Sequence, residues 1–228
     1  MLRTRSRAAA SRKAPLRQRS CGWLGAVALL PIGTACISAD YRPPELGDHE
    51  AEYERTVDRP FDETWQALVD YAASTYFGIE NFEKDSGLLT LSFGAENPGD
   101  FVDGGYWKAR GGNLAQSIDF EGNYVDYATM YLEGRLQARM NIVVRPVNDE
   151  TTAVRVNTRY VFAVSRQDGS GRHYTETWSF ESGGSDTVTI RNPTSGTPKT
   201  RTLMPTYKAE KAILEAIEHL PTSGSSRP

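Results

Sequence analysis

The sequence predicts an α+β fold in which a curved antiparallel sheet packs on a C-terminal helix, as a single domain after a signal peptide. Apolar residues recur at helical spacing within 60–73 and again within 206–220. Between these two stretches, segments of alternating apolar and polar residues are separated by turn-forming residues, which is typical of half-buried antiparallel strands. A long first helix, a strand-rich middle and a last helix fit one α+β domain.

The first 35 residues have the organisation of a secretory signal peptide. Residues 1–20 contain seven basic side chains and no acidic one, a bias that keeps the start of an exported chain in the cytoplasm. An uncharged, mostly apolar run then extends from Cys21 to Cys36. It is shorter than the roughly 20 apolar residues of a membrane-spanning helix, and Pro31 interrupts it. We therefore expect this segment to be cleaved.

The run ends in Gly33-Thr34-Ala35-Cys36, which resembles the motif recognised by lipoprotein signal peptidase. We expect cleavage before Cys36 and lipid attachment to its thiol; ordinary cleavage and an uncleaved anchor are the alternatives. The only other cysteine, Cys21, would leave with the signal, so the mature domain would have no disulfide. In similar proteobacterial lipoproteins, a residue other than aspartate after the cysteine, here Ile37, implies retention in the outer membrane, facing the periplasm; the inner membrane is the alternative.

Cleavage before Cys36 would leave 193 residues, enough for one domain with a substantial core. All 29 acidic residues but only 19 of the 26 basic residues lie beyond the signal, so the mature chain has a formal charge of −10. Nucleic acids and anionic lipid headgroups require a basic surface on the protein that binds them. We therefore expect neither as a partner.

The mature chain divides into a tether, a domain and a tail. Residues 36–51 are polar and contain Pro43-Pro44, and we expect them to form a tether between lipid and domain. The domain is predicted to span 52–220, with a first strand within 52–58. Residues 221–228 have the composition of a disordered tail.

The first helix is predicted from Arg59 to Ala73. Pro60 and the two acidic residues after Phe61 suit a first helical turn, where a missing N–H and negative charge are both favourable. Helical spacing places on one face Phe61, Trp65, Leu68, Val69 and Ala72. We expect this face to be core.

Strand pairs follow. The apolar segments Tyr76–Phe82 and Leu88–Phe93 flank Asp85-Ser86-Gly87, which supplies the left-handed geometry of a hairpin turn. Alternation is clearest in 136–144 and 154–164, which we predict to pair antiparallel. Shorter alternating segments lie at 174–180 and 187–190, and a loop precedes the last helix, within 206–220, whose apolar face is Ala209, Ile213, Leu214 and Ile217.

Residues 94–128 show no sustained periodicity, and we interpret them as a long loop rich in glycine and aromatic residues. Large amphipathic rings are typical of recognition surfaces. The sequence therefore suggests an interaction loop whose candidate contacts are Phe101, Asp103, Tyr106, Trp107, Tyr124 and Tyr127. The alternative is that these rings fold back against the end of the sheet.

The order of elements fits a helix-grip arrangement, in which a curved sheet wraps a terminal helix. The residues Thr56–Leu68, Phe77-Gly78-Ile79 and Asp85–Leu89 resemble the opening of the helix-grip domains of the outer-membrane assembly lipoprotein NlpB, a component of the BAM complex. They are also similar to the start of START-like domains. The first resemblance implies a protein-interaction role and the second an apolar ligand cavity. The resemblance ends at residue 93, and we expect no counterpart of the second NlpB domain.

No pattern in the sequence indicates catalysis, a metal or a cofactor. The histidines His49, His173 and His219 have no partners at metal-ligand spacing. Asp100 and Asp103 are interpreted as turn residues, because no further oxygen ligands follow at calcium-loop spacing. Ser165 and Ser170 lie near His173 without a nucleophile-elbow motif. We expect a non-catalytic envelope lipoprotein that binds protein partners; a carrier of an apolar small molecule is the alternative, and an enzyme that uses residues 94–128 is a third.

Overall fold

A computed structural model describes residues 38–47, 49–112, 117–167, 171–191 and 198–219. All of these residues belong to one compact unit. The predicted signal peptide, Cys36 and the predicted tail 221–228 lie outside the described residues.

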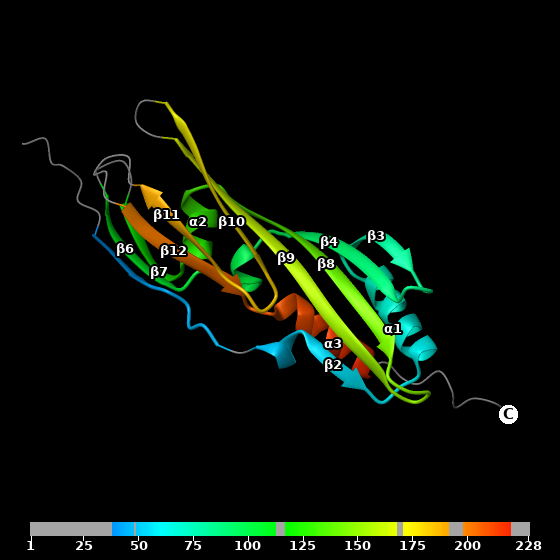
Figure 1. Cartoon of the computed structure of the whole chain (residues 1–228). Coiled ribbons are helices and arrows are strands. Elements are labelled where there is room, and N and C mark those ends of the chain that lie inside the picture. Colours follow the sequence, from blue (N-terminus) through cyan, green and yellow to red (C-terminus); the bar gives the residue numbers. More distant parts are fainter. Residues whose placement is uncertain (1–37, 48, 113–116, 168–170, 192–197, 220–228) are drawn as a thin grey trace, which may run out of the picture. The chain divides into compact units, whose positions relative to one another are not determined.

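A six-stranded antiparallel sheet forms the centre of the domain (Figure 1). Its order is β10-β9-β8-β4-β3, and β2 also pairs with β9. The strands are β2 (Glu54–Val57), β3 (Gly78–Glu83), β4 (Leu88–Ala95), β8 (Gly134–Pro146), β9 (Thr152–Gln167) and β10 (His173–Glu181). The longest pair is β8 and β9, in register from Gly134 opposite Val164 to Pro146 opposite Thr152. The predicted pairing of these strands and the predicted hairpin of β3 and β4 are confirmed.

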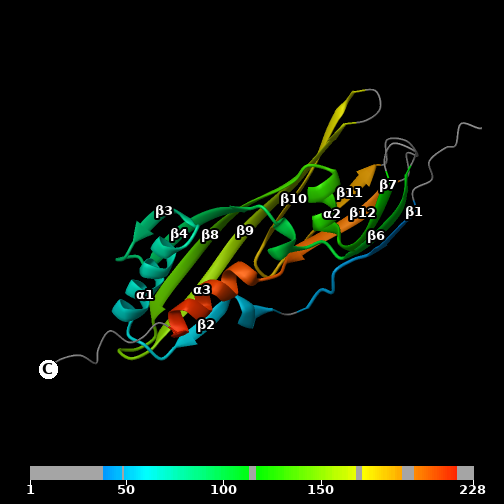
Figure 2. The same cartoon turned by 180° about the vertical axis from the view of Figure 1, so that it is seen from behind.

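Two helices cover one face of this sheet, as Figure 2 shows: α1 (Phe61–Ser74) and α3 (Lys208–His219). Their apolar faces meet every second residue of the strands, because side chains alternate across a strand. The side chains without exposed surface at this interface include Leu68, Met140, Ile142, Val154, Val156, Ile213, Leu214 and Ile217. The predicted curved antiparallel sheet packed on a C-terminal helix is therefore confirmed.

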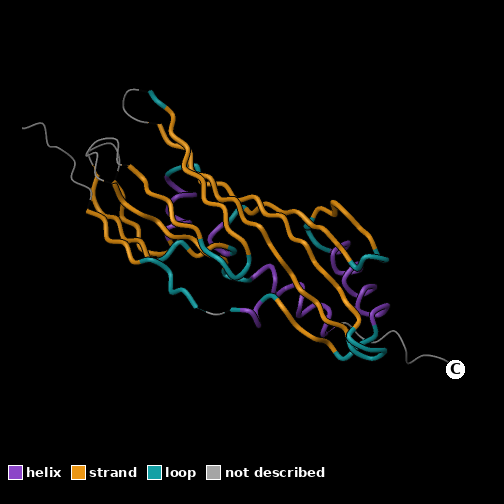
Figure 3. The backbone as a smooth tube through the Cα atoms, viewed as in Figure 1, coloured by secondary structure: helices purple, strands orange, loops and turns teal. Residues whose placement is uncertain are grey.

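Two smaller sheets extend the domain (Figure 3). One has the order β1-β6-β7, from β1 (Ser38–Arg42), β6 (Tyr106–Gly112) and β7 (Ser117–Asn123). The other has the order β11-β12-β5, from β11 (Asp186–Arg191), β12 (Pro198–Pro205) and β5 (Val102–Asp103). A helix, α2 (Tyr124–Tyr131), follows β7, and short 3-10 helices η1 (Glu50–Glu52) and η2 (Pro98–Asp100) lie in the connections.

The interpretation of 94–128 as an irregular loop is wrong, because the segment contains η2, β5, β6, β7 and most of α2. The alternation of apolar and polar residues does not indicate β6 and β7, because Gly111, Gly112 and Gly122 occupy strand positions in them. Glycine has no side chain that would show which face of the strand is buried. The predicted loop before the last helix also contains a strand, β12. Its partner β5 lies about a hundred residues earlier in the sequence, so no local pattern indicates the pairing.

The expectation of a tether over 36–51 is wrong for Ser38–Arg42, which form β1. This strand pairs with β6 along its whole length, from Ser38 opposite Arg110 to Arg42 opposite Tyr106. The hydroxyl of Tyr41 accepts a hydrogen bond from the backbone N–H of Thr202 at 2.9 Å, which joins β1 to β12. Polar composition suggested a tether, but backbone pairing with a distant strand decides the structure.

Candidate functional site

Four of the six candidate contact residues lie inside the domain. Phe101, Trp107, Tyr124 and Tyr127 are buried. The ring of Trp107 packs against Tyr124 at 5.6 Å and against Tyr127 at 5.3 Å between centroids. For these four rings the arrangement agrees with the alternative that they fold back against the end of the sheet.

The aromatic cluster surrounds a buried arginine, Arg201 on β12. Its guanidinium carbon lies 4.2 Å from the ring centroid of Tyr41, 4.5 Å from that of Trp107 and 5.3 Å from that of Tyr124. Aromatic faces attract a cation, and the attraction strengthens away from water. Burial lowers the pKa of Arg201 and raises that of Tyr124. This cation–π cluster joins the two smaller sheets, a role the sequence did not indicate.

The other two candidates, Asp103 and Tyr106, are partly exposed and engaged locally. Asp103 accepts a hydrogen bond from the N–H of Gly105 at 2.8 Å, as expected of a turn residue. The hydroxyl of Tyr106 donates to Glu121 at 2.8 Å. A contact of these two residues with a partner stays a prediction.

The residues weighed for metal binding or catalysis are dispersed. Asp100 pairs with Lys208 at 3.1 Å rather than joining Asp103. The hydroxyl of Ser165 lies 3.4 Å from that of Thr175, and His173 is exposed at the start of β10. Ser170 lies outside the described residues. Within the described part of the chain, no group of three or more His, Cys, Asp or Glu residues is placed to hold a metal ion.

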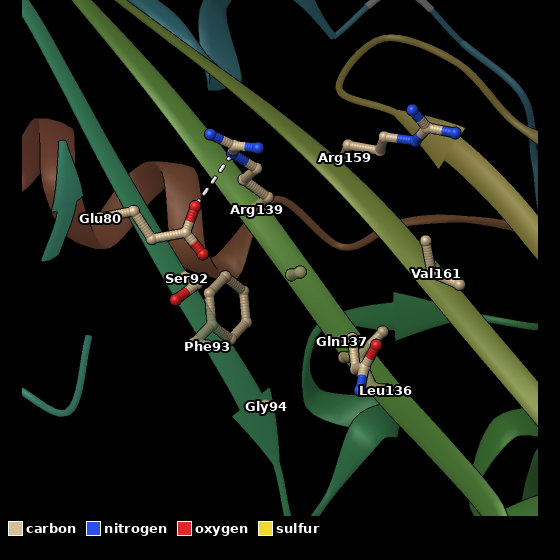
Figure 4. Close-up of a pocket in the computed structure, with 10 residues that line it drawn as sticks. Glu80, Ser92, Phe93, Gly94, Leu136, Gln137, Arg139, Arg159 and Val161 are labelled. Atoms are coloured by element: carbon tan, nitrogen blue, oxygen red, sulfur yellow. Dashed lines mark ion pairs between the residues drawn. The ribbon is translucent and has the colours of Figure 1, made fainter. Parts of the chain in front are cut away.

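The face of the six-stranded sheet that no helix of the described residues covers carries a groove of about 590 Å³. It lies on the face opposite α1 and α3, where the outward residues of β8 and β9 are exposed. The groove forms because Ser92 and Gly94 on β4 are small and face longer side chains on β8 and β9 (Figure 4). It is lined by Glu80, Ser92, Phe93, Gly94, Leu136, Gln137, Ala138, Arg139, Arg159 and Val161.

Two arginines give the groove its charge. The Nε atom of Arg139 lies 3.1 Å from Oε2 of Glu80 on β3, and the arginine side chain remains 61% exposed. Arg159 is the direct partner of Arg139 on the neighbouring strand β9. Its guanidinium points toward β10, where Nε lies 3.4 Å from Oγ of Ser179 (Figure 4). The lining of the groove therefore includes two arginines from paired positions on β8 and β9 and one carboxylate.

The arginines of the groove belong to a larger set on the same sheet face. Outward positions of β8 and β9 carry Arg135, Arg139, Arg145, Arg155 and Arg159, all exposed. The sequence contains the signal that locates them, because arginine recurs at the polar positions of both alternating segments, whereas residues 36–228 together have a formal charge of −10. The apolar half of the alternation predicted the strands, and the polar half carries these arginines.

Comparisons with known proteins found no matching family model, and no significant match among curated proteins or solved structures. The likeness to NlpB and START-like domains therefore stays a resemblance of the residues quoted above. Of the helices in the described ranges, none is both long and apolar enough to cross a membrane.

Proposed function

We propose that this chain is a non-catalytic envelope lipoprotein, anchored through lipid on Cys36 to the outer membrane and facing the periplasm, whose helix-grip-like domain binds an acidic segment of a protein partner. The observation that carries the binding role is the arginine-bearing groove on the face of the central sheet opposite α1 and α3. The lipid anchor rests on the N-terminal sequence alone.

Charge complementarity supports an acidic partner. The mature chain has a formal charge of −10, yet this face carries five arginines on two adjacent strands. Arg139 pairs with Glu80 at 3.1 Å and Arg155 with Glu54 at 3.3 Å, so part of this positive charge is neutralised within the sheet. Complementary charges guide the approach of a partner and reject partners of like charge. Arginine also binds carboxylates through two parallel N–H donors, which adds geometric selectivity. An acidic protein segment is thus the ligand that best matches the groove.

The packing between sheet and helices supports a protein-binding role over transport of an apolar molecule. A side chain that lines a ligand-sized cavity has surface accessible to a water-sized probe. At this interface Leu68, Met140, Ile213 and Leu214 have none. The space that would hold an apolar ligand in a START-like arrangement is occupied by side chains at these positions.

The test is site-specific photo-crosslinking in the envelope of the producing cell. A photo-reactive amino acid replaces Gln137, which is exposed and lines the groove. We expect a cross-linked protein whose yield falls at least about tenfold, the equivalent of 1.4 kcal/mol, in the Arg139→Ala, Arg159→Ala double variant. The matched control is Arg110→Ala with Lys84→Ala, which removes two cations from exposed ion pairs elsewhere. Equal loss in both double variants, or no cross-link at position 137, would contradict the proposed site.

A steric variant provides a second arm that leaves every charge in place. Gly94 lies on the groove floor, and a Cβ atom there would meet only the backbone oxygen of Leu136, at 3.4 Å. Gly94→Val should narrow the groove, because the Cβ atom has room there and a strand interior favours a β-branched residue over Gly. We expect loss of the cross-link with an unchanged midpoint of thermal unfolding. A retained cross-link would place the partner elsewhere.

A further inference from the structure

Strand β1 is fixed to the domain from the second residue after Cys36. All five of its residues pair with β6, and the hydroxyl of Ser38 donates to the backbone oxygen of Arg110 at 3.2 Å. The ring of Tyr41 packs against Trp107 and Arg201, and its hydroxyl is hydrogen-bonded to Thr202. β1 therefore provides no length of free chain between the lipid and the domain.

Chain length limits how far Cys36 lies from the sheet. Two residues of fully extended chain span at most about 7 Å. The α-carbon of a lipidated Cys36 is thus within about 7 Å of that of Ser38 whatever conformation Ile37 adopts. A lipid on Cys36 would hold this end of the β1-β6-β7 sheet at the membrane surface.

The neighbouring strands extend at least as far in the same direction. β1 and β6 are antiparallel, and Ser38 at the start of β1 lies opposite Arg110. The residues of β6 after Arg110 therefore lie at the same end of the sheet as Cys36, which precedes β1 in the chain. Gly111 pairs with Ile118 and Gly112 with Ser117 beyond the last pair of β1. Two residues of strand add about 7 Å, so Gly112 and Ser117 reach the level of Cys36 or pass it.

The residues at this end suit a membrane surface. Gly111, Gly112, Ser117 and Ile118 carry no charge. The first charged pair behind them is Arg110 with Asp119, at 3.0 Å, and its charges cancel. An uncharged end is not repelled by anionic headgroups, even though the mature chain is acidic overall.

We infer that the end of the β6–β7 pair, formed by Gly111, Gly112, Ser117 and Ile118, contacts the headgroup surface of the bilayer that holds the lipid of Cys36. This inference rests on the lipidation proposed above. The short chain between Cys36 and β1 brings this end to the bilayer, and electrostatic attraction does not contribute to the contact. The domain is therefore held with one defined end on the membrane rather than on a flexible tether.

The test uses the mature lipoprotein in vesicles of phosphatidylethanolamine and phosphatidylglycerol that contain a lipid with a nitroxide on its headgroup. Lipidation blocks the thiol of Cys36, the only cysteine after the signal, so Ser117→Cys provides a unique site for a fluorescent label. The matched control is Lys84→Cys, at the exposed turn between β3 and β4. We expect nitroxide quenching several-fold stronger at position 117 than at 84, and unchanged in about 1 M salt, where exposed charges are screened.

A linker variant separates the effect of the short anchor from any affinity of the end itself. Inserting about ten Gly and Ser residues between Ile37 and Ser38 should lower quenching at 117 to the level at 84, because such a linker is flexible. Three results would each overturn this inference alone. The first is equal quenching at 117 and 84 without the insertion. The others are quenching at 117 that survives the insertion and quenching at 117 that is lost in high salt. An unmodified Cys36 by mass spectrometry would overturn the lipidation, and this inference with it.

Discussion

The hydroxyl of Tyr160 on β9 donates a hydrogen bond to the carboxylate of Glu210 on α3, 2.7 Å from Oε2, and both side chains are fully buried. Oε1 of the same carboxylate accepts from Ser182 at 2.7 Å. A buried carboxylate is costly unless its oxygens are hydrogen-bonded. These two donors therefore fix the first turn of α3 against the sheet and the turn after β10.

Tyr160→Phe should destabilise the domain at neutral pH by about 1–3 kcal/mol, because it leaves a buried charged acceptor with one donor fewer. The measurement is urea denaturation of the unlipidated chain 37–228, which retains all of β1. Tyr174→Phe, at a partly exposed position on β10, serves as the control and should cost less. A loss for Tyr160→Phe no larger than for Tyr174→Phe would contradict the role of the buried bond.

Alkaline pH should remove this stabilisation. Burial, and then the negative charge of Glu210, raise the pKa of Tyr160 well above its ordinary value. A group whose pKa is higher in the folded state contributes its stabilisation in full below the unfolded pKa, about 10 for tyrosine, and loses it as pH rises through the folded pKa. The difference in unfolding free energy between wild type and Tyr160→Phe should therefore shrink above about pH 10. A difference that stays constant between about pH 8 and 11 would contradict this assignment.

Trp65→Ala should lower the free energy of unfolding by about 3–5 kcal/mol, the usual cost of emptying a large buried aromatic site. Trp65 is 2% exposed and packs between Phe61 and Phe82, with ring centroids at 6.1 and 5.4 Å. Gln66→Ala on the exposed side of the same helix is the control, with an expected change within about 0.5 kcal/mol. Equal small losses for both variants would show that α1 contributes little to the core.

Cys36→Ser should abolish labelling by radioactive palmitate and leave an unprocessed precursor, because lipoprotein maturation requires the thiol. Cys21→Ser should leave labelling unchanged, since Cys21 lies within the predicted signal. The measurement is metabolic labelling followed by gel electrophoresis of membrane and soluble fractions. Soluble protein of mature size from Cys36→Ser would instead show ordinary signal cleavage.

The sequence by itself determined the elements whose signals are local. The stripe containing Trp65 and Leu68 predicted α1, the alternation around Met140 and Val156 predicted the longest strand pair, and Ile213 and Ile217 predicted α3. Side-chain period reports secondary structure wherever one face of an element is buried and the other is wet. The polar positions of the same alternating segments carry the outward arginines, of which Arg139 and Arg159 line the groove.

Only the tertiary structure decided the pairings between segments far apart in the chain. β1 joined β6, β12 joined β5, and the rings of Trp107 and Tyr124 turned inward around Arg201. Composition could not distinguish a polar tether from an edge strand, or a recognition loop from an aromatic core, because the same residues serve both. The choice depends on which distant backbone groups and which cation they meet, and that is settled only when the chain has folded.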